Sequence, residues 1–255
     1  MGTPYGIGVT EPHRVHTPPT PGLDIRLVHA EEAFVVIEKP AGMLSVPGRG
    51  EEKQDCARAR VEAMFPDATG SITCHRLDMD TSGLLVMGLD PVTHRKLSGQ
   101  FEKRSVRKWY TALIEGHTDR PLGELFTVNV PQCVDWPNRP LQKIDFKNGK
   151  AGKTDIIPLA HESWTTPAGE TIDVTRLDMR PITGRTHQLR LHCAAPPEVE
   201  SPKGVVPGGM ASPIVGDRLY GDEALAPRLL LHAEKLGFWH PYNGDWVKFE
   251  APAPF

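Results

Sequence analysis

The sequence predicts an α+β domain with a mixed, largely antiparallel sheet and helices packed against it. Short apolar and β-branched runs outnumber the segments with helical spacing, and many connections are too short for the crossovers that parallel strands need. The 24 glycines and 25 prolines among 255 residues imply many turns. A chain of this length can bury a sizeable core, and we expect one domain over residues 23–255.

The first part of the chain predicts a polar arm, a strand, a loop and a helix. Residues 1–22 are rich in Pro, Gly and Thr without apolar periodicity, which predicts a flexible Pro-rich arm. The β-branched run AFVVIEKP, residues 33–40, predicts a strand that ends at a proline. The glycine-rich residues 41–50 then predict a loop, and QDCARARVEAMF, residues 54–65, has helical spacing.

A buried strand and a capped helix come next. The continuous apolar run GLLVMGLD, residues 83–90, predicts a strand. Asp90 and Pro91 have the residue types of a helix N-cap and first helical position. We therefore expect a helix from Pro91 toward Arg104.

The basic segment, residues 94–110, has the sequence HRKLSGQFEKRSVRKWY and begins on this predicted helix. It holds six basic residues against Glu102 alone and ends in two aromatics; the basic residues are Arg95, Lys96, Lys103, Arg104, Arg107 and Lys108. Taken alone, such a segment is typical of a solvated helix face. Its interpretation therefore depends on the rest of the chain.

The remainder of the chain predicts four strands, a short helix and an inserted loop. The strand signals are KWYTALIEG, ELFTVNV, KTDIIPLA and TIDVTRLDMRP, at residues 108–116, 124–130, 153–160 and 171–181. THQLRLHCAA, residues 186–195, predicts a short amphipathic helix. Residues 196–213, rich in Pro and Gly, predict an inserted loop.

Composition argues against several classes of protein. The net charge of −3 argues against indiscriminate nucleic-acid binding. No window approaches the roughly 18 apolar residues of a membrane span, and the N-terminus lacks the apolar core of a signal peptide, so we expect a cytoplasmic protein. The four cysteines have no paired spacing and predict neither a disulfide framework nor a cysteine-type zinc site; they are Cys56, Cys74, Cys133 and Cys193.

Asp78 lies in HRLDMDTSGLLVM, residues 75–87, at the border of a predicted apolar strand. An aspartate before Thr-Ser-Gly can form a turn with its own backbone, which is a structural interpretation. The alternative is that the Asp78 carboxylate takes part in catalysis.

Four segments, in their order and spacing, closely resemble the RluA family of RNA pseudouridine synthases: EKPAGMLSVPG, HRLDMDTSGLL, RKWYTALIEG and TGRTHQLRLH. The resemblance runs from about Phe34 to the C-terminus. VDWPNRPLQK and APRLLLHAEKL, residues 134–143 and 226–236, are similar to the branch that acts on a large-subunit ribosomal RNA stem-loop and the anticodon arm of certain tRNAs. The resemblance implies a pseudouridine synthase catalytic fold with RNA in a central cleft. The arm and residues 196–213 depart from the family pattern, and we expect no separate N-terminal RNA-binding domain before Phe34.

The resemblance also implies roles for particular residues. Asp78 would be the catalytic carboxylate, Arg185 its ion-pair partner, and Tyr110 would pack against the target base. Arg76, two residues before Asp78, would enter the space that the flipped base leaves. The RNA backbone would be bound by the basic residues Lys103, Arg104, Arg107, Lys108 and Arg139. The reaction requires no redox change and no external group, so we expect no cofactor and no metal. We also expect a monomer whose partner is RNA.

Two other classes of function remain open at this point. A metal-dependent hydrolase would bring His75, Asp78, His187 and His192 together around an ion, although the chain has no HExxH spacing. An RNA-binding module without catalysis would keep the RNA contacts and form no pseudouridine. A phosphate-binding loop is not indicated, because KPAGMLSVPGRG lacks the GKS or GKT ending.

Overall fold

The computed structural model describes residues 22–255, so the predicted arm lies outside the described residues except for Gly22. The helices are α1 Ala57–Met64, α2 Pro91–Glu102 and α3 Gln188–Ala194, with short 3-10 turns at Glu51–Lys53 and Glu223–Leu225. The strands are β1 Arg26–Ala30, β2 Phe34–Lys39, β3 Ser82–Gly88, β4 Arg107–Glu115, β5 Phe126–Val134, β6 Gln142–Ile144, β7 Lys150–Thr165, β8 Thr171–Pro181, β9 Glu198–Ser201, β10 Gly204–Pro207, β11 Leu231–Trp239 and β12 Trp246–Glu250.

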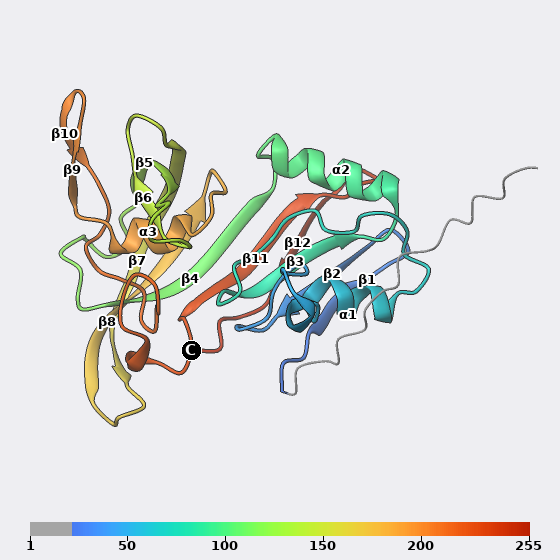
Figure 1. Ribbon diagram of the computed structural model, residues 1–255, viewed down its shortest axis with the longest axis horizontal. Helices are drawn as coiled ribbons and strands as arrows, with labels where there is room; N and C mark the ends of the chain where they lie inside the picture. Colours follow the sequence, from blue (N-terminus) through green and yellow to red (C-terminus); the bar gives the residue numbers. More distant parts are fainter. Residues whose placement is uncertain (1–21) are drawn as a thin grey trace, which may run out of the picture.

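Ten of these strands form one sheet in the order β1-β2-β3-β11-β4-β8-β7-β5-β6, with β12 paired to β11 (Figure 1). The pairs are antiparallel except β3 with β11, which is parallel. The predicted α+β class with a mixed, largely antiparallel sheet is therefore confirmed. In Figure 1, β4 runs between one half of the fold, with β5 to β10 and α3, and the other half, with β1 to β3, α1 and α2.

The parallel pair brings β3 and β11 together at Gly83. Gly83 has φ +115°, and a Cβ at this position would lie 2.4 Å from the backbone oxygen of Ala233. Only glycine tolerates both this conformation and this close approach. The glycine of the Thr-Ser-Gly motif thus allows β3 and β11 to pair closely, five positions after Asp78 in the chain.

The predicted start of α2 is confirmed. The Asp90 carboxylate accepts hydrogen bonds from the backbone N–H groups of Val92 at 2.8 Å and Thr93 at 3.0 Å, and Pro91 is the first helical residue. These contacts satisfy N–H groups that have no partner within the helix.

Hydrophobic clusters lie on both faces of β2 and β3. Val35 and Ile37 pack on the α1 side, whereas Phe34 and Val36 pack with Leu97 of α2. A strand that is buried on both faces has a continuous apolar run and not an alternating one, which is the pattern that predicted these two strands. A third cluster fills the space between α3 and β4, β5, β7 and β8.

Two sequence predictions differ from the structure. The helix expected to be amphipathic, α3, is buried at six of its seven positions, because the sheet covers one side and residues 209–217 cover another. The loop expected over residues 196–213 contains the β9–β10 hairpin, which pairs four residues on each side. Alternation of Val and Glu in PPEVESPKGVVP is the signal for this hairpin that the turn-residue content masked.

Besides the β9–β10 hairpin, four strands were not predicted: β1, β6, β11 and β12. β1 and β12 are edge strands with exposed positions, β6 has only three residues, and β11 carries a register shift that interrupts its alternation. Each depends on its neighbours for stability more than on its own sequence. None of the helices within residues 22–255 has the length and apolar character needed to cross a membrane.

Candidate active site

Asp78 lies in the segment that joins α1 to β3, and hydrogen bonds hold the backbone on either side of it. The Ser45 hydroxyl donates to the Leu77 carbonyl at 2.7 Å and accepts from the Leu77 N–H at 3.0 Å. The Thr81 N–H donates to the Asp78 carbonyl at 3.2 Å. Within the described part of the chain, the Asp78 carboxylate itself accepts no hydrogen bond. The turn is thus held by backbone and Ser45, which leaves the carboxylate available for chemistry.

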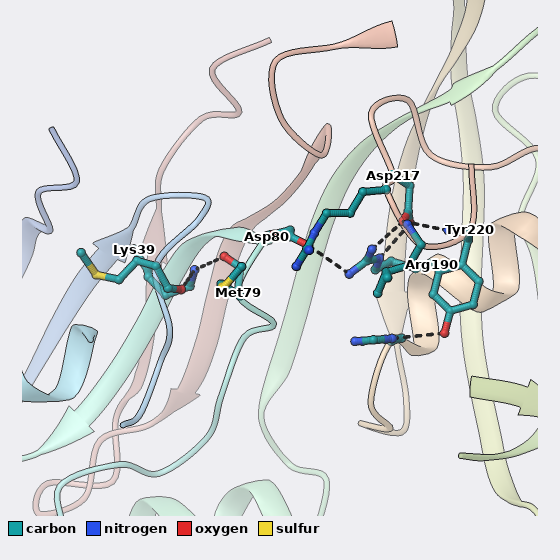
Figure 2. A network of polar contacts seen from close by, with 10 residues as sticks. Lys39, Met79, Asp80, Arg190, Asp217 and Tyr220 are labelled. Carbon is teal, nitrogen blue, oxygen red and sulfur yellow. Dashed lines mark hydrogen bonds and ion pairs between the residues drawn. The ribbon is translucent and has the colours of Figure 1, made fainter. Parts of the chain in front are cut away.

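Lys39, the last residue of β2, is hydrogen-bonded to Met79, the residue after Asp78 (Figure 2). It is fully buried, and its ammonium group donates to the carbonyls of Met43 at 2.7 Å, Pro40 at 2.8 Å and Met79 at 3.1 Å. These three acceptors match the three N–H bonds of an ammonium group. Burial lowers the pKa of Lys39 to about 7, and the Asp78 carboxylate opposes this shift.

A pocket of about 720 Å³ opens in front of Asp78, between the two halves of the sheet. It brings together six of the residues predicted from the sequence: Arg76, Asp78, Arg104, Lys108, Tyr110 and Arg185. Its walls come from segments far apart in the chain, including β4, the end of β8 and α3. The other three predicted residues, Lys103, Arg107 and Arg139, do not line it.

Tyr110 reaches the pocket from β4 and packs against hydrophobic clusters of both halves. Burial, together with the nearby Asp78 charge, raises the pKa of Tyr110 above its usual value. The phenol therefore stays neutral beside the carboxylate and offers a ring face and a hydroxyl to a ligand.

The predicted ion pair between Arg185 and Asp78 is absent from residues 22–255. Arg185 lines the pocket, but its Nε donates to the carbonyl of Ala151 at 3.1 Å. The reason is its position in the loop before α3, which directs its side chain toward β7. The catalytic role of Arg185 remains a prediction.

Arg190, which the sequence analysis did not select, is the buried cation of the site. Its Nε donates to Asp217 Oδ2 at 2.8 Å, a second nitrogen contacts the other oxygen of Asp217, and Nη1 lies 3.6 Å from Asp80 (Figure 2). Burial disfavours its charge, yet the Asp217 hydrogen bonds and the charge of Asp78 raise the pKa of Arg190. An arginine between two leucines, Leu189 and Leu191, in a short predicted helix is the sequence signal that could have identified it.

Asp217 fixes Arg190, and Arg218 continues the network to Asp80. The Asp217 carboxylate is fully buried, and Arg218 Nε donates to Asp80 at 2.9 Å. Asp80 therefore contacts two guanidinium groups, one buried and one exposed. Alternating charges of this kind hold Arg190 in one orientation beside the catalytic segment.

His187 and Tyr220 complete the wall of the site on the α3 side. His187 has a left-handed backbone, φ 54°, and its Nδ1 lies 3.1 Å from the Tyr220 hydroxyl. The same hydroxyl accepts from the Gln142 N–H at 2.7 Å, so it connects β6 with the start of α3. Burial lowers the pKa of His187, against the opposing charge of Asp78, so this histidine is neutral near pH 7.

The side chains of the basic segment lie in different places in the structure. Arg104 and Lys108 line the pocket, whereas the Arg107 guanidinium lies over the Trp246 ring at 5.9 Å. Lys103 is exposed at the end of α2 without lining the pocket. Burial, with Arg104 nearby, lowers the pKa of Lys108 to about 8.

The two remaining RNA-binding predictions fall at different places. Arg76 is exposed at the pocket, immediately before Leu77, as a residue that inserts into RNA would be. Arg139 lies in the β5–β6 connection, where its guanidinium covers the exposed Trp136 ring at 4.1 Å. Their roles in RNA binding stay predictions.

The four residues of the hydrolase alternative do not converge. Within residues 22–255, no group of three or more His, Cys, Asp or Glu side chains is arranged to hold a metal ion. His75 Nε2 instead accepts from the Val86 N–H at 3.1 Å, and its ring stacks on Phe101. Burial lowers the pKa of His75 to about 3 and that of His192 to about 4.

Comparisons with known proteins identify the family of the chain. Residues 33–195 match the family model described as RNA pseudouridylate synthase. The chain is 43% identical over 244 residues to a dual-specificity RNA pseudouridine synthase RluA from Pasteurella multocida, covering 94% of this chain and 98% of the relative. The relative of that name from Escherichia coli K12 is 38% identical over 232 residues, covering 90% and 93%. The solved structure of human RNA pseudouridylate synthase domain containing 1 is similar with a TM-score of 0.70 and 27% identity, covering 94% of this chain and 87% of that chain.

Proposed function

The chain belongs to the RNA pseudouridylate synthase family, and from this premise we propose that it isomerises specific uridines of ribosomal and transfer RNA at Asp78. One observation supports the assignment of the site. The Asp78 carboxylate has no hydrogen-bond partner among the described residues, and it lies in a pocket with Tyr110 and beside buried Arg190. As a member of this family, the chain is an RNA uridine isomerase.

The reaction breaks the bond from the base nitrogen N1 to the sugar carbon C1′, turns the base, and forms a bond from C1′ to the base carbon C5. The proton on C5 leaves and a proton is gained at N1, so atoms and electrons balance within the substrate. This step needs a carboxylate near the sugar, acting as nucleophile or as base, in a pocket shielded from water. Asp78 supplies that carboxylate.

Residues near Asp78 have other roles in the reaction. Arg190 contributes a buried positive charge beside Asp78, and Asp217 keeps Arg190 in place. Tyr110 presents its ring to the target base from β4. Arg185, on the pocket wall, is placed to contact the substrate backbone or base without being held by Asp78.

Uridine within a folded RNA reaches Asp78 only if it leaves the base stack. Arg76 is exposed next to the catalytic segment, and a planar guanidinium can stack in the vacated space. Arg104 and Lys108 supply positive charge at the same pocket for the phosphates that flank the flipped nucleotide.

The substrate class follows from the relatives. The dual specificity in their names, with the resemblance of residues 134–143 and 226–236, supports a stem-loop of large-subunit ribosomal RNA and the anticodon stem-loop of tRNA as targets. A single catalytic domain over residues 23–255, working as a monomer in the cytoplasm, is part of the same proposal.

The test is pseudouridine sequencing of two RNA transcripts, large-subunit ribosomal RNA and a tRNA pool, each incubated with the full chain. We expect one or a few uridines in stem-loops to become pseudouridine in both pools. Modification of one pool only would restrict the proposal to that class. RNA that is bound but unmodified would contradict it and favour a binding module without catalysis.

A further inference from the structure

A second surface with aromatic and cationic side chains lies on β4, β11 and β12, facing away from the pocket. We call it the outer face and define it as Arg107, Trp109, Lys235, Trp239, Trp246 and Lys248. The strand register aligns these residues in rows: Lys235 pairs with Trp109, Gly237 pairs with both Arg107 and Lys248, and Trp239 pairs with Trp246. The intervening residues Lys108, Tyr110, Leu236 and Phe238 point to the pocket or the core.

Two indoles of this face are unusually exposed. Trp239 is 49% exposed and Trp246 is 37% exposed. Large aromatics on a three-stranded surface are uncommon where only water covers them, because each indole could bury a large apolar area. Their exposure therefore points to a ligand with apolar faces.

Gly237 shapes the platform under these indoles. A Cβ at Gly237 would lie 2.5 Å from Cζ2 of Trp246, so the missing side chain allows the indole to lie across β11. Trp239 meets this ring edge-on, with centroids 5.2 Å apart and planes at 73°. The two rings support each other, which fixes their orientation before any ligand arrives.

Cations alternate with the rings. The Arg107 guanidinium lies 5.9 Å from the Trp246 ring, and the Lys248 ammonium lies 5.7 Å from the Trp109 ring. Lys235 adds a third positive charge, against Glu250, which pairs with Lys248. Aromatic rings next to cations are the combination with which proteins bind single-stranded nucleic acid, because bases stack on the rings and phosphates contact the cations.

We propose that the outer face binds a single-stranded segment of RNA, stacking bases on Trp239 and Trp246 and holding phosphates with Arg107 and Lys248. A protein partner fits less well, because the cores of protein interfaces are depleted in lysine and this face carries two. The inference goes beyond the proposed function, since the pocket and the outer face lie on opposite sides of β4. The enzyme thus holds RNA at a second place, outside the stem-loop that it modifies.

The test uses a probe that cannot be a substrate for uridine isomerisation, a fluorescently labelled oligoadenylate of about ten nucleotides, titrated with the full chain. The double variant Trp239→Leu with Trp246→Leu keeps apolar bulk and loses the stacking surface, whereas Trp239→Phe with Trp246→Phe keeps a ring at each place. Stacking is worth about 1–3 kcal/mol per base, so losing both rings should weaken binding by the leucine variant at least about thirtyfold. The phenylalanine variant should bind within about threefold of the parent.

Two controls separate this inference from the catalytic proposal. A saturating unlabelled stem-loop substrate should leave the oligoadenylate bound, and both double variants should modify that short stem-loop at the parental rate. Equal oligoadenylate affinity of the leucine variant and the parent would overturn the inference, and so would displacement of the oligoadenylate by the stem-loop. Neither result would bear on pseudouridine formation, which the stem-loop assay measures separately.

The charges give an independent check. Replacing both cations, Arg107→Gln with Lys248→Gln, should lower the slope of log affinity against log salt for oligoadenylate by about 1.4, because each phosphate contact on a single strand contributes about 0.7. The matched change Lys203→Gln, in the exposed turn of the β9–β10 hairpin, should leave the slope unchanged. A slope that stays constant in the first variant would also overturn the inference.

Discussion

The pocket face and the outer face of β4 are formed by alternate residues of the same short segment. In RKWY, residues 107–110, Lys108 and Tyr110 line the pocket, while Arg107 contacts Trp246 and Trp109 contacts Lys248 on the other side. Because successive side chains of a strand point to opposite faces, one basic and aromatic segment supplies two surfaces. A cluster of charge in sequence is therefore not a cluster in space.

The two faces also hold their charges differently. On the pocket side, Arg190 is fixed by hydrogen bonds to a buried carboxylate, and Lys39 is fixed by three carbonyls. On the outer side, Arg107 lies over the Trp246 ring, and Lys248 lies over the Trp109 ring and pairs with Glu250. Buried, hydrogen-bonded charges suit a reaction that tolerates little displacement, whereas surface charges suit the binding of a flexible strand.

The largest effect should come from Asp78→Asn, which removes the reacting charge from the pocket face and leaves its shape. We expect pseudouridine formation to fall on the order of 10³-fold or more in single-turnover assays, with stem-loop affinity within a few fold. Oligoadenylate binding to the outer face should not change. The matched control is Asp67→Asn at an exposed aspartate after α1, and the assignment of Asp78 fails if both variants have parental turnover.

The second effect concerns which arginine, Arg190 or Arg185, matters more for the reaction at Asp78. Arg190→Lys keeps the charge but loses one of the two hydrogen bonds to Asp217, which is worth about 2 kcal/mol for a charged group. If that orientation matters in the transition state, turnover should fall by roughly thirtyfold. Arg185→Lys, which loses a bond to a backbone carbonyl, should reduce turnover less.

Rate and binding must be measured separately in both lysine variants. A positioning role predicts a lower single-turnover rate at saturating RNA with little change in affinity, at a temperature where both variants are folded. A larger loss in Arg185→Lys than in Arg190→Lys would restore the ion pair expected from the sequence and contradict the role of Arg190.

A third comparison uses the salt dependence of RNA binding to distinguish the pocket face from the outer face. Arg104→Gln, on the pocket face, should lower the salt slope for stem-loop binding by roughly 0.7 to 0.9. Arg107→Gln should leave the stem-loop slope unchanged and lower the oligoadenylate slope by about 0.7. If neither variant changes the stem-loop slope, the RNA backbone lies elsewhere, and Arg139, Lys143, Lys147 and Lys150 are the next residues to replace.

The smallest effect should be a pH dependence of RNA affinity from Lys108. Its pKa is lowered to about 8 in the free protein, and a bound phosphate would raise it, because the phosphate favours the ammonium form. Affinity for the stem-loop should therefore be constant below pH 8 and fall by up to tenfold per pH unit above it. Lys108→Arg keeps its charge throughout and should remove this fall; an equal fall in both proteins would assign the titration to another group.

The sequence by itself determined the local features of this protein. The buried strands β2 and β3, the start of α2 at Asp90 and Pro91, and the family all followed from residues close together in the chain. Asp78 was selected in the same way, since its motif is contiguous. Short-range hydrogen bonds and apolar runs carry such signals without knowledge of the partner.

Only the tertiary structure decided which side chains meet. Asp217 holds Arg190 across 27 positions of the chain, and the parallel pairing of β3 with β11 joins segments 150 positions apart at Ser82 and His232. The family resemblance implied Arg185 as the partner of Asp78, but the sequence could not show that the loop before α3 directs this side chain to β7. The division of residues 107–110 between two faces likewise required the strand and its neighbours, because pleat and register, not composition, fix where each charge points.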